Sequence, residues 1–82
     1  MDVFEQVKEA ICKVQPGVDE SKIVPSTLLG NDLDIDSLGM VELALALEDA
    51  LGFYLPDNEL EDVATVSDAV ALVESKLKNR DA

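Results

Sequence analysis

Apolar residues recur at spacings of three and four in the first part of the chain, which is the period of an amphipathic helix. The apolar positions on this face are Val3, Phe4, Val7, Ile11 and Val14. Asp2, with Glu5 three residues later, is typical of a capping arrangement at a helix start. Pro16 cannot continue a helix and Gly17 favours a chain reversal, so the pattern predicts a helix that ends just before them.

A long connection follows over residues 18–35, where Pro25, Gly30 and Asn31 argue against regular structure. Apolar side chains are nevertheless spread through it, at Ile23, Val24, Leu28, Leu29, Leu33 and Ile35. We expect these side chains to hold the connection against the helices. A connection of this length in a small domain is often functional.

The strongest helical signal runs from Ser37 to Leu51, a segment rich in Ala and Leu. Asp36 is a natural N-cap, and Gly52 is a natural residue for the left-handed turn that ends a helix. Projected at about 100° per residue, the segment has two apolar faces. The face expected in the core contains Met40, Leu43, Leu47, Ala50 and Leu51.

The second apolar face lies on the same side as Ser37 and contains Leu38, Val41 and Leu45. The acids that interleave with it are Glu42, Glu48 and Asp49. One interpretation is that the 18–35 connection covers this face and makes it part of the core. The other is a docking surface, whose apolar centre and charged rim complement a basic partner.

The rest of the chain predicts two more helical segments. Residues 56–62 favour one short turn with acids near its start, where the helix dipole prefers negative charge. Thr65 followed by Asp68 resembles a capping box and opens a last helix, whose apolar stripe is Val66, Ala69, Val70, Val73 and Leu77. No strand pattern is found. The predicted fold class is therefore all-α, a single domain over residues 1–82 built as a small four-helix bundle, with three longer helices, one short helix and a long first loop.

Composition excludes several function classes. The 82 residues include no histidine, which removes Ser-His and Cys-His nucleophile pairs and histidine metal ligands. The single cysteine, Cys12, cannot form an internal disulfide and is best explained as a small semi-buried residue. A formal charge of −12 argues against nucleic acid and anionic membrane surfaces as partners. Since neither a signal peptide nor an apolar run of membrane-spanning length is found, we expect a cytoplasmic protein without membrane insertion. We also expect a monomer, and a non-catalytic protein, because no catalytic constellation can be assembled from these residues.

The charges are also segregated along the chain. Residues 23–75 contain twelve acids and no lysine or arginine, and all six bases lie outside this stretch. Such segregation produces a field that steers basic proteins toward the acidic surface. The alternative is a solvated acidic face that only aids solubility.

Ser37 opens the central helix, where unpaired backbone N–H groups and the helix dipole favour an anion such as a phosphate. Asp34 and Asp36 are close enough in sequence to hold a divalent cation together with the phosphates of an incoming donor. The chain itself has no group to activate this hydroxyl, so chemistry on it requires another enzyme; a purely capping role is the alternative. The spacing of Asp32, Asp34 and Asp36 matches the first positions of a calcium-binding EF-hand loop. Ser37 stands where that loop needs glycine and Leu43 where it needs glutamate, so we reject an EF-hand and predict no resident metal site, although weak binding of a divalent ion at the acidic cluster stays open.

Residues 32–38, Asp-Leu-Asp-Ile-Asp-Ser-Leu, followed by Val-Glu-Leu at 41–43, resemble the acyl carrier protein family. The resemblance continues through Leu-Glu-Asp at 47–49, Leu-Pro-Asp at 55–57 and Thr-Val-Ser-Asp at 65–68, and it covers nearly the whole chain. The Asp-Ser-Leu triplet alone is a weak signal. Its combination with the other motifs, the length and the acidity is a strong one.

This resemblance implies that Ser37, between Asp36 and Leu38, receives 4′-phosphopantetheine from coenzyme A through a magnesium-dependent phosphopantetheinyl transferase. The thiol of that arm then carries acyl groups as thioesters among the enzymes of fatty-acid or polyketide synthesis. The implied partners are the transferase, ketosynthases, acyltransferases or acyl-activating enzymes, and other synthase components with basic docking patches. The docking residues that the family's recognition helix implies are Leu38, Val41, Glu42, Leu45, Glu48 and Asp49, the same face that the projection found.

The sequence departs from the family pattern at two positions near the serine. Asp34 stands where family members often have glycine, and Gly39 stands where they frequently have an acid. Glycine weakens a helix, so we expect mobility at the start of this one. An aminoacyl or peptidyl carrier and an unmodified acidic helical adaptor remain alternatives, although the Asp-Ile-Asp-Ser approach at 34–37 is more similar to acyl carriers.

Overall fold

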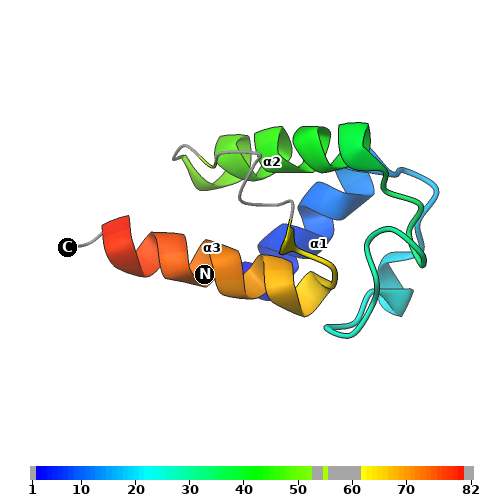
Figure 1. Cartoon of the computed structure of the whole chain (residues 1–82), viewed down its shortest axis with the longest axis horizontal. Helices are drawn as coiled ribbons and strands as arrows, with labels where there is room; N and C mark the ends of the chain where they lie inside the picture. Colours follow the sequence, from blue (N-terminus) through cyan, green and yellow to red (C-terminus); the bar gives the residue numbers. More distant parts are fainter. Residues whose placement is uncertain (1, 53–54, 56–61, 81–82) are drawn as a thin grey trace.

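Three α-helices and one short 3-10 turn make up the described part of the chain (Figure 1). The computed structural model describes residues 2–52, 55 and 62–80. In chain order the elements are α1 (Val3–Val14), the 3-10 turn η1 (Glu20–Lys22), α2 (Ser37–Leu51) and α3 (Val66–Arg80). Within the described ranges, the strand-like pairing is limited to one isolated bridge, between Leu28 and Thr65.

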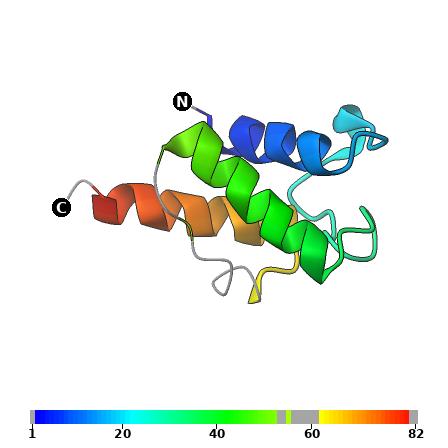
Figure 2. The same ribbon diagram turned by 90° about the horizontal axis from the view of Figure 1, so that it is seen from above.

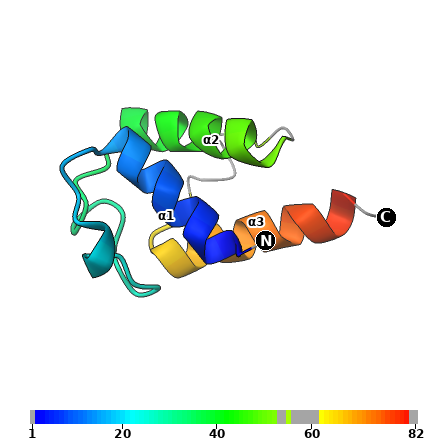
Figure 3. The ribbon, with the colours of Figure 1, turned by 180° about the vertical axis from the view of Figure 1, so that it is seen from behind.

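Helix α1 packs against both α2 and α3 and so joins the other two helices. In Figure 1, α2 and α3 run along opposite sides of the bundle, and Figure 3 shows from behind that α1 crosses between them. Seen from above in Figure 2, the connection from α1 to α2 lies at the end of the bundle where α2 begins. None of the helices in the described residues has the length and apolar character needed to cross a membrane.

Capping side chains begin each helix as the sequence predicts. Asp2 accepts hydrogen bonds from two backbone N–H groups in the first turn of α1. Asp36 accepts from the backbone N–H of Gly39, with 2.8 Å between the carboxylate oxygen and the nitrogen. At the start of α3, the Thr65 hydroxyl accepts from the Asp68 N–H at 3.1 Å, and the Asp68 carboxylate accepts from the Thr65 N–H at 3.2 Å. These bonds satisfy N–H groups that have no partner within the helix, and they therefore define where each helix starts.

The core is formed by buried apolar side chains from all three helices and from the connection. It includes Val7 and Ile11 of α1, Leu43 and Leu47 of α2, Val66 and Val73 of α3, and Ile23, Leu29, Leu33 and Ile35 of the connection. Each fully buried large aliphatic side chain contributes about 1.5–3 kcal/mol relative to an exposed one. The connection is therefore held by its own apolar residues, as predicted.

Two of the apolar residues predicted to hold the connection, Val24 and Leu28, remain exposed. Each directly follows or precedes a buried residue, Ile23 and Leu29 respectively. Neighbouring residues in an extended backbone point to opposite sides, so only one of each pair can face the core.

Backbone hydrogen bonds also attach the connection to the residues that start α3. The Leu29 N–H donates to the Ala64 carbonyl at 2.9 Å, and the Val66 N–H donates to the Thr27 carbonyl at 3.0 Å. The connection is thus fixed to α3 by its backbone and to the core by its side chains. This gives the residues just before α2 a defined path.

The predicted bounds of the three longer helices are confirmed, including the end of α2 at Gly52, whose φ is 78°. The short helix predicted at 56–62 lies outside the described residues, apart from Asp62. The turn η1 was not predicted; Asp19 is its N-cap, and its carboxylate accepts from the Ser21 N–H at 3.0 Å and from the Ser21 hydroxyl at 2.7 Å. Side-chain bonds of this kind stabilise one turn locally, which apolar periodicity does not reveal.

One residue of the predicted core face on α2 is misplaced. The projection puts Ala50 in the core, but Ala50 is exposed and Ala44 is buried instead. Both residues lie at an edge of the apolar face, and both side chains are single methyl groups that carry little hydrophobic signal. The edge of the buried face was therefore decided by which neighbouring elements cover α2.

Candidate functional site

Ser37 is the first residue of α2, and its side chain is exposed. The preceding residue, Asp36, has an extended backbone, and its carboxylate turns toward the helix to accept the Gly39 N–H. This cap holds Asp36 against the first turn. The serine beside it stays accessible to another protein.

The start of α2 favours a negative group at Ser37. The first turn contains no acidic side chain. Asp36 occupies one of the first backbone N–H groups, and the others, together with the positive end of the helix dipole, attract an anion. A phosphate ester on the Ser37 hydroxyl fits this environment, because its charge would lie at the end of the helix that prefers it.

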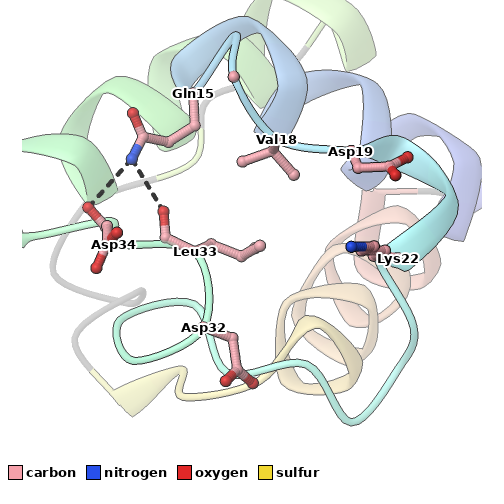
Figure 4. A pocket seen from close by; sticks show the side chains of 8 residues that line it. Gln15, Val18, Asp19, Lys22, Asp32, Leu33 and Asp34 are labelled. Atoms are coloured by element: carbon pink, nitrogen blue, oxygen red, sulfur yellow. Dashed lines mark hydrogen bonds between the residues drawn. The ribbon is translucent and has the colours of Figure 1, made fainter.

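The backbone that leads to Ser37 contains a left-handed residue, Asp34, with a φ of 57°. The amide of Gln15, at the end of α1, donates to the Leu33 carbonyl at 2.9 Å and to the Asp34 carbonyl at 3.2 Å (Figure 4). The next residue, Ile35, is buried, and its N–H donates to the Leu29 carbonyl at 3.0 Å. Contacts from α1, the connection and the core therefore all determine where Ser37 stands.

A shallow groove of about 330 Å³ runs beside the serine. The residues that line it include Ser37 and Met40 of α2 together with Leu28, Leu29 and Val63. The groove thus offers apolar contact next to an exposed hydroxyl. A group attached at Ser37 would have this surface within reach.

The second apolar face of α2 is open to solvent. Leu38 is 66% exposed, Leu45 is 59% exposed and Val41 is 36% exposed. The acids that border it are Glu42 and Asp49, which are exposed, and Glu48, which is half-buried. The connection therefore does not cover this face, and the interpretation that makes the face part of the core is wrong.

The three alternating aspartates of the connection do not form an EF-hand. The Asp32 carboxylate accepts from the Leu28 N–H at 2.8 Å, and the Asp36 carboxylate caps α2. Both groups are used to hold the backbone. Within the described ranges, no group of three or more acidic or cysteine side chains is arranged to hold a metal ion.

Gly39 has a packing role that the sequence interpretation missed. A Cβ atom at this position would lie 2.8 Å from the Ile35 Cγ2 and 3.3 Å from the Asp36 carboxylate. The sequence points only to flexibility at this glycine, whereas in the structure its missing side chain is what lets Ile35 pack against the first turn of α2. Gln15 was also missed, and nothing in the sequence pattern marks it, because its partners lie 18 and 19 residues away.

Cys12 is half-buried on α1, in keeping with its expected role as a small packing residue. Burial raises the pKa of its thiol above the ordinary value of 9.0, and the nearby Glu20 carboxylate adds to this effect. A thiol with a raised pKa is mostly protonated near neutral pH and is a poor nucleophile. Cys12 is therefore not part of the candidate site.

Comparison with known proteins shows the family to which the chain belongs. The family described as "Phosphopantetheine attachment site" matches residues 5–73. An acyl carrier protein from Helicobacter hepaticus (strain ATCC 51449 / 3B1) is 41% identical over 75 residues, which covers 92% of this chain and 97% of that protein. The chain therefore belongs to the acyl carrier protein family, whose members are non-catalytic carriers, and it contains a phosphopantetheine attachment domain.

Proposed function

We propose that Ser37 is the residue to which 4′-phosphopantetheine is attached, by a phosphopantetheinyl transferase that takes the group from coenzyme A. The observation that carries this assignment is an exposed serine hydroxyl at the first residue of α2, directly beside the exposed apolar face of that helix. When bound, the arm supplies a thiol that holds acyl groups as thioesters. The protein supplies the attachment point, the favourable charge environment of the helix start and the surface that partners recognise.

The residues around Ser37 have distinct parts in this proposal. Asp36 caps α2 and holds the turn on which the serine stands. The backbone N–H groups of the first turn stabilise the phosphate charge. The reaction itself needs a base and a metal-bound donor, and both are expected from the transferase, since the chain has no histidine.

We place the docking surface on α2. Leu38, Val41 and Leu45 form its apolar centre, and the rim acids are Glu42, Glu48 and Asp49. An apolar centre with a charged rim suits a partner with a basic, partly apolar patch, and long-range attraction speeds the encounter. The partners proposed are the transferase, ketosynthases, acyltransferases or acyl-activating enzymes of fatty-acid or polyketide synthesis, in the cytoplasm.

The test is the intact mass of the protein after incubation with coenzyme A, magnesium and a broad-specificity transferase. The wild type should gain one phosphopantetheine group, and Ser37→Ala should gain none. Ser67→Ala is a matched control, because Ser67 is also an exposed serine in the first turn of a helix. It should be modified like the wild type.

Other outcomes separate the alternatives. Absence of modification with several transferases would favour an unmodified acidic adaptor. Modification followed by loading only from an amino-acid-activating enzyme would favour an aminoacyl carrier. Modification that persists in Ser37→Ala would place the attachment residue elsewhere.

A further inference from the structure

The side chain of Gln15 joins the end of α1 to the segment that leads to Ser37. Gln15 is the first residue after α1, and its amide nitrogen donates to two successive carbonyls, those of Leu33 and Asp34. Figure 4 shows this amide pointing across the gap between α1 and the connection, with both bonds made by the same nitrogen. The bond to Leu33 is partly buried, so it is shielded from competition with water.

These two bonds depend on the backbone conformation of Asp34. In an extended chain successive residues face opposite directions, so two neighbouring carbonyls do not point at one donor. The dihedral angles of Asp34 set the relative direction of the Leu33 and Asp34 carbonyls, and its left-handed φ of 57° turns both toward Gln15. That conformation is unfavourable for a non-glycine residue, although aspartate tolerates it better than most. The Gln15 amide therefore hydrogen-bonds and stabilises a residue whose own backbone conformation is unfavourable.

The neighbouring hydrogen bonds do not replace this link to α1. The Asp34 N–H donates to the Gly30 carbonyl at 3.0 Å, and the Ile35 N–H donates to the Leu29 carbonyl at 3.0 Å. Both bonds join residues of the connection to one another, so they stabilise its turn but do not attach it to α1. Gln15 supplies the attachment.

From this point the backbone reaches Ser37 in three residues, each of which is held. Asp34 is bound by Gln15, Ile35 is only 5% exposed in the core, and Asp36 is bonded to the first turn of α2. A change in the dihedral angles of Asp34 would therefore move Ile35 and Asp36, and with them the position of the serine.

We propose that Gln15 is a positioning residue for Ser37: its amide fixes the left-handed turn at Asp34 and so presents the hydroxyl to the transferase in one orientation. This inference rests on the proposed function of Ser37. A misplacement of reacting groups by about 1 Å can lower a rate by up to roughly a hundredfold, so a modest rearrangement of the turn is enough to matter.

The test replaces Gln15 with methionine, which keeps the size of the side chain and removes the donor. We expect kcat/KM for phosphopantetheine transfer to fall on the order of tenfold, as for the loss of two neutral hydrogen bonds, with a larger change in kcat than in KM because the α2 docking face is unchanged. Hydrogen exchange of the Gly39 N–H, which is bonded to Asp36, should become faster, while exchange in the core of α3 stays the same. Gln6→Met is the matched control, because Gln6 lies on α1 and is the only other glutamine in the chain.

A second substitution separates positioning from general stability. Asp34→Gly removes the penalty against a left-handed backbone, so in the Gln15→Met background it should restore kcat/KM to within about threefold of the wild type. The proposal is overturned if Gln15→Met is modified like the wild type, or if it unfolds more readily throughout and Asp34→Gly restores nothing. If the wild type itself accepts no group, the proposed function fails, and the exchange rate of the Gly39 N–H then decides the role of Gln15 by itself.

Discussion

The close approach at Gly39 leads to a prediction about stability that has the opposite sign from the one helix propensity gives. Replacing glycine by alanine in a helix normally stabilises it, by up to about 1 kcal/mol. Here the added Cβ would lie 2.8 Å from the Ile35 Cγ2, which real contacts do not tolerate. Ile35 cannot easily yield, because it is β-branched, its χ1 is stiff and it is only 5% exposed in the core.

The magnitude follows from three contributions. Overpacking of a core costs about 1–3 kcal/mol. The added Cβ is also 3.3 Å from the Asp36 carboxylate, so part of a cap worth about 1 kcal/mol is at risk. Against the gain in propensity, we expect Gly39→Ala to lower the free energy of unfolding by about 1–2 kcal/mol. In a domain of this size each kcal/mol corresponds to roughly 4–8 °C in Tm.

The assay is urea denaturation and thermal melting of Gly39→Ala beside two other Gly→Ala variants. Gly17→Ala should change stability by less than about 0.5 kcal/mol, because nothing lies within 4 Å of its Cβ position. Gly52→Ala meets no neighbour either, but its φ of 78° should cost about 1 kcal/mol through backbone strain alone. If Gly39→Ala is as stable as the wild type or more stable, the packing of Ile35 against α2 is not as described.

Three further predictions concern the exposed face of α2 and the cap of α3. Leu45→Ala should lower the free energy of unfolding by less than about 1 kcal/mol, since Leu45 is 59% exposed, whereas Leu47→Ala should lower it by about 2–5 kcal/mol, because Leu47 is fully buried. Chemical denaturation of both variants tests this. Equal losses of stability would contradict the burial pattern. Glu42→Lys should lower the association rate with an immobilised transferase, and by less at high salt, while Glu74→Lys on α3 should bind like the wild type. Association rates measured over a range of ionic strengths test this. Equal effects of the two substitutions would mean that the partner does not dock on this face of α2. Backbone hydrogen bonds from Ala64 and Thr65 lower the pKa of the Asp68 carboxyl below its ordinary 3.8, so Asp68→Ala should lower Tm at pH 7. The difference in Tm between the wild type and this variant should shrink as the pH falls through the folded-state pKa of Asp68. A difference that stays constant down to pH 2 would refute the role of the Asp68 carboxylate as a cap.

The helices and the candidate serine were determined by the sequence itself. The bounds of α1, α2 and α3 follow from apolar spacing and from capping side chains such as Asp36 and Thr65, and these interactions act within about four residues. The place of Ser37 at the first residue of α2 could be predicted for the same reason, and its proposed role as the attachment residue came from the resemblance of the Asp-Ser-Leu segment to acyl carrier proteins.

The tertiary structure decided which surfaces stay open and how the serine is held. The sequence allowed the connection to cover Leu38, Val41 and Leu45, and only the folded path of the backbone shows that it does not. The bonds from Gln15 to the Asp34 turn join residues 18 and 19 positions apart, and the space required at Gly39 is set by the placement of Ile35. Contacts of this kind depend on where separate elements meet, and neither periodicity nor capping chemistry carries that information.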